Sequence, residues 1–348
     1  MIKLLVVDDS LFMRKILTDI LQEDEEISVV GEAKDGKEAL EKIPLLNPDV
    51  ITLDIEMPIM DGITTLKYIV EQYHIPVIMI SSLTEEGACH TLKALEMGAV
   101  DFIAKPKNIF GINAEPIKRE IINKIKSVAE SKVKLNNNKR NIPKITRQDY
   151  ARSIMTDGYE YIVAIGTSTG GPRALQSVIP LLPENLNGAI LVVQHMPPNF
   201  TKSLADRLDV LSSIKVKEGE NGDVLKRGHC YIAPGDFHMR IRNEDGQNII
   251  RLSKEPPIKG LRPAVDILME SIARLEHYKK IGIVMTGMGI DGSKGVIQIK
   301  KSKGYTIAQD KDSSVVFGMP KSAIDTNHID KIVPLDNIAH EIVSIVGV

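Results

Sequence analysis

The regular alternation of short apolar runs with amphipathic stretches over residues 2–125 limits the fold more than any other feature of this sequence. Buried strands are predicted at Lys3–Val7, Ser28–Glu32, Val50–Leu53, Val77–Ile80 and Asp101–Ala104. Apolar residues at helical spacing lie between and after them, for example at Leu11–Gln22, Gly36–Lys42 and Ala114–Glu130. This rhythm predicts five βα units and therefore an α/β fold with a doubly wound parallel sheet.

A second α/β region follows a change in composition. Lys132–Arg152 holds seven Lys or Arg residues, a single acid and a run of three Asn, which is typical of a flexible linker. A nucleic-acid-binding arm is the alternative, but no recognition motif accompanies it. Strand-like runs then return at Tyr161–Ile165, Ala189–Val193 and Ile281–Met285, with weaker candidates at Thr306–Gln309 and Ile332–Pro334. We therefore expect domains at residues 1–125 and 154–348, joined by a helix end and linker at 126–153.

The stretch Lys215–Leu252 departs from this rhythm. Its short β-like pieces are separated by Gly-rich turns at Gly228, Gly235 and Glu244–Gly246. Such turns are typical of β-hairpins, so we expect hairpins appended to the second parallel sheet.

Composition narrows the function classes. The chain of 348 residues has a formal net charge of −2 and no Trp, which argues against general binding to nucleic acid. Cys89 and Cys230 lie far apart with no metal-type spacing, so we expect two reduced thiols. No apolar run approaches membrane-spanning length, and the run that begins at Ile2 is cut by Asp8 and Asp9. These features predict a buried first strand rather than a signal peptide, no membrane insertion, and a cytoplasmic protein.

Polar residues follow four of the five predicted strands of the first half, at the edge where parallel strands end. Asp8 and Asp9 follow the first strand, Asp54 the third, Ser81 the fourth and Lys105 the fifth. Converging carboxylates need a shared cation, and Mg²⁺ prefers such oxygen ligands. With one hydroxyl and one ammonium, the set suits transfer of a phosphoryl group onto a carboxylate. Helix capping by these acids is the alternative.

The spacing of these residues resembles the two-component receiver domain. The motif residues are Asp8-Asp9, Asp54, Met57-Pro58, Asp61-Gly62, Ser81 and Lys105-Pro106. The resemblance covers residues 1 to about 125 and implies a flavodoxin-like (βα)5 fold with Asp54 as the phosphoacceptor. It also implies that Mg²⁺ is held by Asp9, Asp54 and the Glu56 carbonyl with help from Asp8. The resemblance further implies that Lys105 pairs with the phosphoryl oxygens and that Ser81 and Phe102 relay the switch.

In the second half, a serine stands on a Gly-rich turn within Tyr161–Leu175. Gly166–Gly170 matches G-x-S-x-G, which holds a nucleophilic serine at a strand-to-helix turn. The segment does not match a dinucleotide-binding loop, because Ser168 stands where the middle glycine of that motif is needed. Helix capping by Ser168 remains an alternative on this segment alone.

A base and an acid are expected at the same sheet edge. His195 follows a fully apolar strand, and His238, in the hairpin region, is its one serious competitor. Asp291 lies in a Gly-rich loop after an apolar strand, where Gly287 and Gly289 flank Met288 and free backbone N–H groups for an oxyanion. The other candidate acids are Asp206, Asp223, Asp266 and Asp310. The order Ser, His, Asp differs from that of α/β-hydrolases, so that fold is not implied.

Six motifs of the second half resemble the catalytic domain of the chemotaxis protein-glutamate methylesterase (CheB) family. They are Gly166–Pro172, Gln194–Pro198, Tyr231–Asp236, Arg262–Asp266, Thr286–Gly292 and Val315–Pro320. The resemblance implies a three-layer α/β/α domain with a triad of Ser168, His195 and Asp291 and the Met288 N–H as an oxyanion donor. It implies hydrolysis of glutamyl methyl esters on the cytoplasmic helices of chemoreceptors, releasing methanol, and deamidation of receptor glutamines, without a cofactor for hydrolysis.

Joined to a receiver, such a domain is expected to be regulated. A chemotaxis histidine kinase is the implied phosphodonor, and we expect the unphosphorylated receiver to block the Ser168 edge. A receiver fused to a non-catalytic interaction module is the alternative. A transcriptional regulator is disfavoured, because the second half has no helix-turn-helix pattern.

Overall fold

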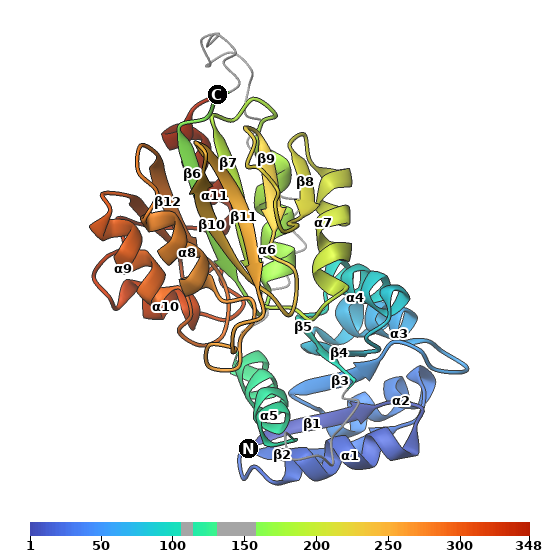
Figure 1. Cartoon of the computed structure of the whole chain (residues 1–348). Helices are drawn as coiled ribbons and strands as arrows, with labels where there is room; N and C mark the ends of the chain where they lie inside the picture. The colour runs from blue at the N-terminus through green and yellow to red at the C-terminus, as the bar shows by residue number, and fades with distance from the viewer. Residues whose placement is uncertain (106–113, 131–157) are drawn as a thin grey trace. The chain divides into compact units, whose positions relative to one another are not determined.

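The computed structural model describes residues 1–105, 114–130 and 158–348. The chain divides into two compact units, Met1–Asn138 and Lys139–Val348 (Figure 1). Most of the predicted linker lies outside the described residues, and the predicted boundary at residue 125 falls within the last helix of the first unit.

The first unit is a five-stranded parallel sheet in the order β2-β1-β3-β4-β5, which confirms the predicted doubly wound fold. Its strands are β1 Ile2–Val7, β2 Ile27–Ala33, β3 Val50–Asp54, β4 Val77–Ser81 and β5 Asp101–Ala104. Its helices are α1 Leu11–Gln22, α2 Gly36–Leu46, α3 Gly62–Tyr68, the π-helix η1 Ile69–Tyr73, α4 Glu85–Met97 and α5 Ala114–Glu130.

Side-chain caps set where the helices of the first unit begin. Ser10, Asp35, Asp61 and Thr84 each accept a backbone N–H from the first turn of α1, α2, α3 and α4. The predicted helix from Gly36 to Lys42 runs on to Leu46 and ends at Asn47, which has a left-handed backbone. The crossovers between parallel strands are right-handed, so a helix changes face where the strand order changes direction. As a result, α1 and α5 cover one face of the sheet, and α2, α3 and α4 cover the other.

The second unit contains a seven-stranded parallel sheet in the order β14-β13-β12-β6-β7-β9-β8. Its strands are β6 Tyr161–Thr167, β7 Gly188–Gln194, β8 Lys215–Glu218, β9 His229–Ile232, β12 Lys279–Val284, β13 Tyr305–Gln309 and β14 Lys331–Val333. The helices are α6 Gly171–Val178, the 3₁₀ turn η3 Ile179–Leu181, α7 Phe200–Leu211, α8 Val265–Ala273, α9 Ser293–Lys301, α10 Met319–Ile324 and α11 Leu335–Val346. The strands β10 His238–Glu244 and β11 Gln247–Ser253 form a separate antiparallel pair.

The prediction that Lys215–Leu252 forms only hairpins was partly wrong. The pair β10 and β11 is a hairpin around the predicted turn at Asp245-Gly246. However, β8 and β9 pair in parallel and extend the main sheet at its edge. The segment Gly219–Gly228 between them is long enough to return the chain to the same end of the sheet, which a short hairpin turn cannot do.

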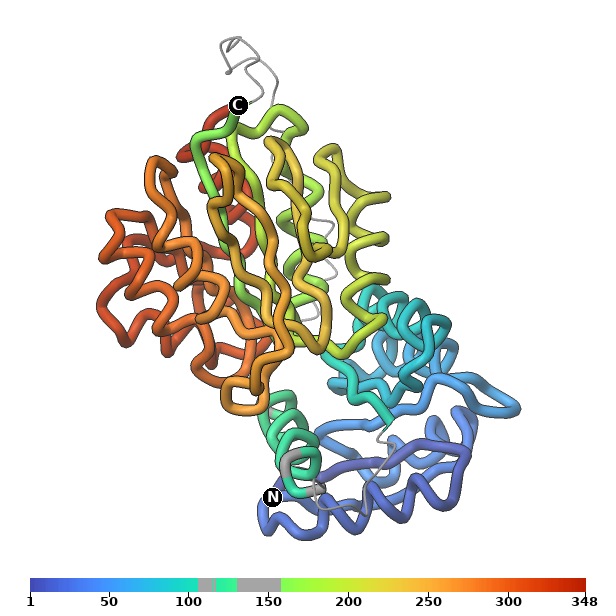
Figure 2. The backbone as a smooth tube through the Cα atoms, in the orientation of Figure 1, coloured from blue at the N-terminus to red at the C-terminus, as the bar shows by residue number. Residues whose placement is uncertain are grey.

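The second unit has three layers (Figure 1, and as a tube in Figure 2). One face of the sheet is covered by α8, α9, α10 and the hairpin, and the other by α6, α7 and α11. Leu268 and Ile272 of α8 pack in one apolar cluster with Met239 and Ile250 of the hairpin and Leu191 of β7. Burial from both faces explains why β6 and β7 are continuously apolar. No helix in the described part of the chain is long and apolar enough to cross a membrane.

Candidate functional sites

Three acidic side chains meet where β1 and β3 end. Asp8 and Asp9 follow β1, Asp54 is the last residue of β3, and one carboxylate oxygen from each lies within 4.8 Å of the others. Asp8 and Asp54 are buried, whereas Asp9 is exposed. The strand-end argument predicted that these acids would lie close together, and in the structure they do.

Lys105 closes this acidic cluster. Its Nζ lies 2.7 Å from Asp54 Oδ2 and 3.4 Å from Asp8 Oδ2, and the Ile55 N–H donates to Asp54 Oδ1 at 2.8 Å. Burial raises the pKa of Asp54 to about 6, and the charge of Asp8 adds to this, against the opposing effect of Lys105. Burial also raises the pKa of Asp8. Burial lowers the pKa of Lys105, but its two carboxylate partners outweigh this and raise it.

The cluster fits a small hard cation. Asp8 Oδ2 is buried, and its ion pair with Lys105 at 3.4 Å is longer than an ordinary N–H···O hydrogen bond, so among the described residues it keeps lone pairs that a cation can use. Because the Asp9 carboxylate is exposed, water can reach the cluster, and Mg²⁺ usually keeps several water ligands. Glu56, whose carbonyl is the fourth predicted ligand, is exposed two residues after Asp54.

The two predicted switch residues lie on neighbouring strands. Ser81 ends β4 and is buried, and its hydroxyl donates to the Gly87 carbonyl of α4 and accepts from Thr91 Oγ1 at 2.6 Å. Phe102 of β5 is also buried, with Lys124 Nζ 5.3 Å from its ring centroid. In this structure the Ser81 hydroxyl is thus bonded to α4.

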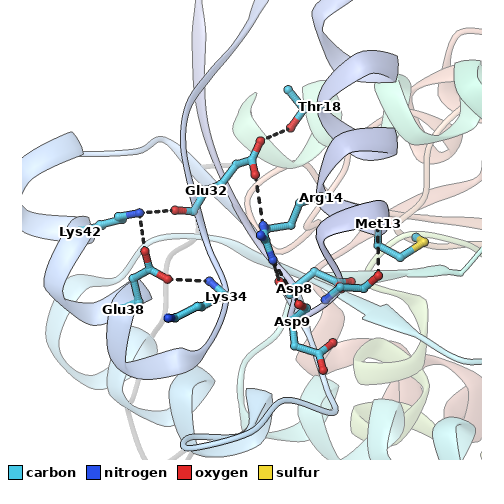
Figure 3. Close-up of polar contacts among 10 residues, drawn as sticks. Asp8, Asp9, Met13, Arg14, Thr18, Glu32, Lys34, Glu38 and Lys42 are labelled. Atoms are coloured by element: carbon cyan, nitrogen blue, oxygen red, sulfur yellow. Dashed lines mark hydrogen bonds and ion pairs between the residues drawn. The ribbon is translucent and has the colours of Figure 1, made fainter.

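Arg14 was missed by the sequence reasoning. Its Nη1 donates to the backbone carbonyls of Asp8 at 2.8 Å and Asp9 at 3.2 Å, and its Nε donates to Glu32 of β2 at 3.1 Å (Figure 3). Thr18 donates to the other oxygen of Glu32. Since its side chain is only 13% exposed, Arg14 fixes the loop that carries both acids.

We expect Arg14→Ala to weaken this loop. Loss of three hydrogen bonds at a mostly buried guanidinium should destabilise the first unit by about 1–3 kcal/mol and slow phosphorylation. The neighbouring Lys15→Ala is the matched control, because Lys15 is exposed and forms a surface ion pair with Asp19 one turn along α1. Amide exchange of β1 and phosphoryl incorporation would measure both effects. Equal behaviour of the two variants would contradict a positioning role for Arg14.

In the second unit, Ser168 lies on the turn between β6 and α6. Gly170 has a φ of +75°, which favours glycine, and Pro172 stands in the first turn of α6. The Ser168 N–H donates to the Thr286 carbonyl at 3.0 Å, and a Cβ built on Gly287 would meet Ser168 Cβ at 2.8 Å. Gly287 therefore lets the loop after β12 approach the serine closely.

His195 and Asp291 meet at the same edge. His195 Nε2 lies 2.8 Å from Asp291 Oδ2, and the side chains are 8% and 6% exposed. The His195 N–H donates to the Thr167 carbonyl, which places the histidine beside the serine turn. Burial tends to raise the pKa of Asp291, but its hydrogen bonds to His195 and to backbone N–H groups outweigh this and lower it. Among the described residues, no hydrogen bond joins the Ser168 hydroxyl to His195.

Gln194 is a second residue that the sequence reasoning missed. It is buried, and its Nε2 donates to the carbonyls of Ser168 and His195, while its Oε1 accepts from Thr167. Gln194 thereby ties the serine turn to the histidine. Its signals in the sequence were its position directly before His195 and its place in the motif Gln194–Pro198, neither of which gave it a role.

Met288 follows Gly287 on the loop beside Ser168. Within the described ranges its backbone N–H donates no hydrogen bond, whereas the Gly287 N–H donates to the Val316 carbonyl. A free amide beside the serine suits an oxyanion donor.

The competing candidates lie in other surroundings. His238 faces the Pro256 carbonyl, and Asp206 and Asp223 pair with Lys202 and Lys217. Asp310 binds Ser313. Asp266 is different, because its carboxylate lies beside Asp291, and their mutual repulsion together with burial raises the pKa of Asp266 to about 6.

The first unit has the fold and the acidic cluster of a receiver domain. The second unit has a serine, a histidine and an aspartate at one sheet edge, as hydrolases do. Residues 4–113 match the response regulator receiver domain, and residues 163–342 match the CheB methylesterase family. The chain belongs to the CheB methylesterase family and carries a receiver domain.

Known relatives agree over the full length. The chain is 49% identical, over all of its own length and 94% of the relative's, to the protein-glutamate methylesterase/protein-glutamine glutaminase of Pyrococcus horikoshii. It is 47% identical to the protein of the same name from Geobacillus kaustophilus, over 99% of both chains. The crystal structure of the Thermotoga maritima CheB methylesterase catalytic domain matches 55% of this chain and all of that chain, with 46% identity and a TM-score of 0.53.

Proposed function

We propose that this chain is a phosphorylation-regulated protein-glutamate methylesterase and protein-glutamine glutaminase. Its substrates are glutamyl methyl esters, and certain glutamines, on the cytoplasmic helices of chemoreceptors. The observation that supports this most directly is the 2.8 Å contact between His195 and Asp291 at the edge that carries Ser168. Family membership and the names of the relatives give the substrate class.

The reaction is acyl transfer without a cofactor. Since His195 Nε2 faces Asp291, Nδ1 is the ring nitrogen left to take the Ser168 proton. Ser168 Oγ attacks the ester carbonyl, the Met288 N–H holds the oxyanion, and the imidazolium returns the proton to the departing methanol. His195 then takes a proton from water, which attacks the acyl-serine and releases glutamate. With glutamine as substrate, ammonia leaves instead.

The first unit accepts the phosphoryl group that controls this reaction. An Asp54 oxygen attacks the phosphorus of a phosphohistidine on the chemotaxis kinase, and the histidine leaves. Asp9, Asp54 and the Glu56 carbonyl would hold Mg²⁺, and Asp8 would assist. When bound, the ion neutralises charge on the phosphoryl oxygens. Lys105 pairs with the same oxygens, and the Ser81 hydroxyl leaves α4 to contact them while Phe102 shifts.

Regulation follows from the joining of the two domains. We place the receiver at 1–125, the helix end and linker at 126–153 and the catalytic domain at 154–348. The unphosphorylated receiver blocks the Ser168 edge from a bulky helical substrate, and phosphorylation shifts the population to an open state. Because the receptor helices and the kinase are cytoplasmic, the chain acts in the cytoplasm.

We expect a small-molecule phosphodonor with Mg²⁺ to raise methanol release from methylated receptor membranes by roughly tenfold, which needs a shift of only about 1.4 kcal/mol in the closed–open equilibrium. The full chain is assayed with and without the phosphodonor. Release that does not respond to it would contradict regulation by the receiver. No release under either condition would favour the alternative, a receiver fused to a non-catalytic interaction module.

A further inference from the structure

The segment Arg262–Asp266, one of the family-like motifs, exchanges hydrogen bonds with the loop that carries Asp291. The Val265 and Asp266 N–H groups donate to Asp291 Oδ2 at 2.7 Å and Oδ1 at 3.0 Å. In return, Asp266 Oδ1 accepts from the Gly295 N–H at 2.8 Å and from the Gly292 N–H at 2.9 Å, a donor that it shares with Asp291 Oδ1 at 3.0 Å. The N-terminal ends of α8 and α9 are therefore joined by hydrogen bonds in both directions.

These reciprocal hydrogen bonds matter because no side chain at the N-cap position of α9 accepts its first N–H groups. Gly292 stands at its N-cap position with a φ of +93° and no side chain to accept the first N–H groups. Asp266 supplies the missing acceptor from another helix. The residue directly before this cap is Asp291, so the backbone that carries the proposed triad acid is fixed by Asp266.

The negative charge of Asp266 does not stabilise the fold, so the side chain is needed there for another reason. Its carboxylate faces that of Asp291 and, along α8, Glu270, and burial with these charges raises its pKa from 3.8 to about 6. The folded state therefore favours protonated Asp266, and stability falls as the pH rises through this range. At neutral pH the ionised side chain opposes folding, whereas a neutral asparagine at this position offers the same acceptor oxygen without that charge.

We propose that Asp266 is a positioning residue for the esterase, which orients Asp291, and through it His195, by holding the Gly292–Gly295 turn. This inference rests on the proposed function and its triad. The residue acts through Asp291 and does not contact the substrate. The acceptor oxygen, rather than the negative charge, performs this role.

The test compares Asp266→Ala with Asp266→Asn in the full chain. For methanol release from methylated receptor membranes, we expect Asp266→Ala to lower kcat by about 10–100-fold with KM unchanged, since misorientation acts on the transition state. Asp266→Asn keeps the acceptor oxygen and should recover kcat to within about fivefold of the parent. Glu270→Gln, on the same helix, is the control and should keep the parental kcat and KM.

Two further measurements separate positioning from folding. Because an ionised carboxylate is removed, Asp266→Asn should be at least as stable as the parent at about pH 8. Amide exchange at Gly295, whose N–H donates to Asp266 Oδ1, should quicken in Asp266→Ala and not in Asp266→Asn. This measurement does not require turnover. Parental kcat and slow exchange in Asp266→Ala would overturn the inference, as would an Asp266→Asn variant as inactive as Asp266→Ala. If the parent chain itself releases no methanol while exchange responds as expected, the proposed function fails and the positioning of the loop stands.

Discussion

Replacing Ser168 by alanine is expected to lower methanol release by about 10⁴-fold or more, because the acyl-enzyme can no longer form. The serine turn itself should survive. It is held by backbone hydrogen bonds from the Ser168 N–H to the Thr286 carbonyl and from the Gly171 N–H to the Ser168 carbonyl. Neither bond uses the hydroxyl, so the variant should fold like the parent.

Ser177→Ala is the matched control for this prediction. Ser177 lies on α6, which follows the same turn, and its hydroxyl donates to the Arg173 carbonyl within that helix. We expect it to keep parental turnover, and both variants to accept a phosphoryl group at Asp54 as the parent does. Turnover that persists in Ser168→Ala would remove the triad assignment without affecting the family or the fold.

Much of the fold could be predicted because its strands are short, apolar and buried on both faces. β1, β3 and β4 were each located to within one residue at either end by their apolar runs. Pairing could not be predicted where the pattern is weak. β8 has one buried residue in four, so nothing in its composition separated a parallel edge strand from half of a hairpin.

The sites show the same division. Topology brings the ends of parallel strands to one edge of a sheet. The strand-end rule therefore predicted that Asp8, Asp54 and Lys105 lie close together on the first sheet, and His195 and Asp291 on the second. Arg14, Gln194 and Asp266 act through hydrogen bonds to backbone groups, which lie six residues away for Arg14 and 26 residues away for the other two. Spacing carries no signal for such bonds, because any polar side chain of suitable reach could make them.

Replacing Asp54 by asparagine is expected to abolish phosphoryl incorporation, since no carboxylate remains to attack phosphorus at this position. Methanol release in the absence of a phosphodonor should stay at the parental level, and its stimulation should disappear. Asp49→Asn is the control, because Asp49 accepts from the Lys3 N–H at the opposite end of β3. Stimulation that survives in Asp54→Asn would mean that the phosphoryl group enters elsewhere.

The same variant should also make the first unit more stable at neutral pH in the absence of Mg²⁺. Burial raises the pKa of Asp54 from 3.8 to about 6, so the folded state binds its proton more tightly than the unfolded state and loses stability as the pH rises through this interval. The difference corresponds to about 3 kcal/mol at most, since each pKa unit is worth about 1.4 kcal/mol and Lys105 loses its closer partner in the variant. Amide exchange of β3 and β4 at about pH 5 and about pH 8 measures this in the full chain, and the advantage of Asp54→Asn should widen with pH. An advantage that is constant across this range would show that the ionised Asp54 carboxylate does not oppose folding, because its ion pair with Lys105 compensates the cost of burying its charge.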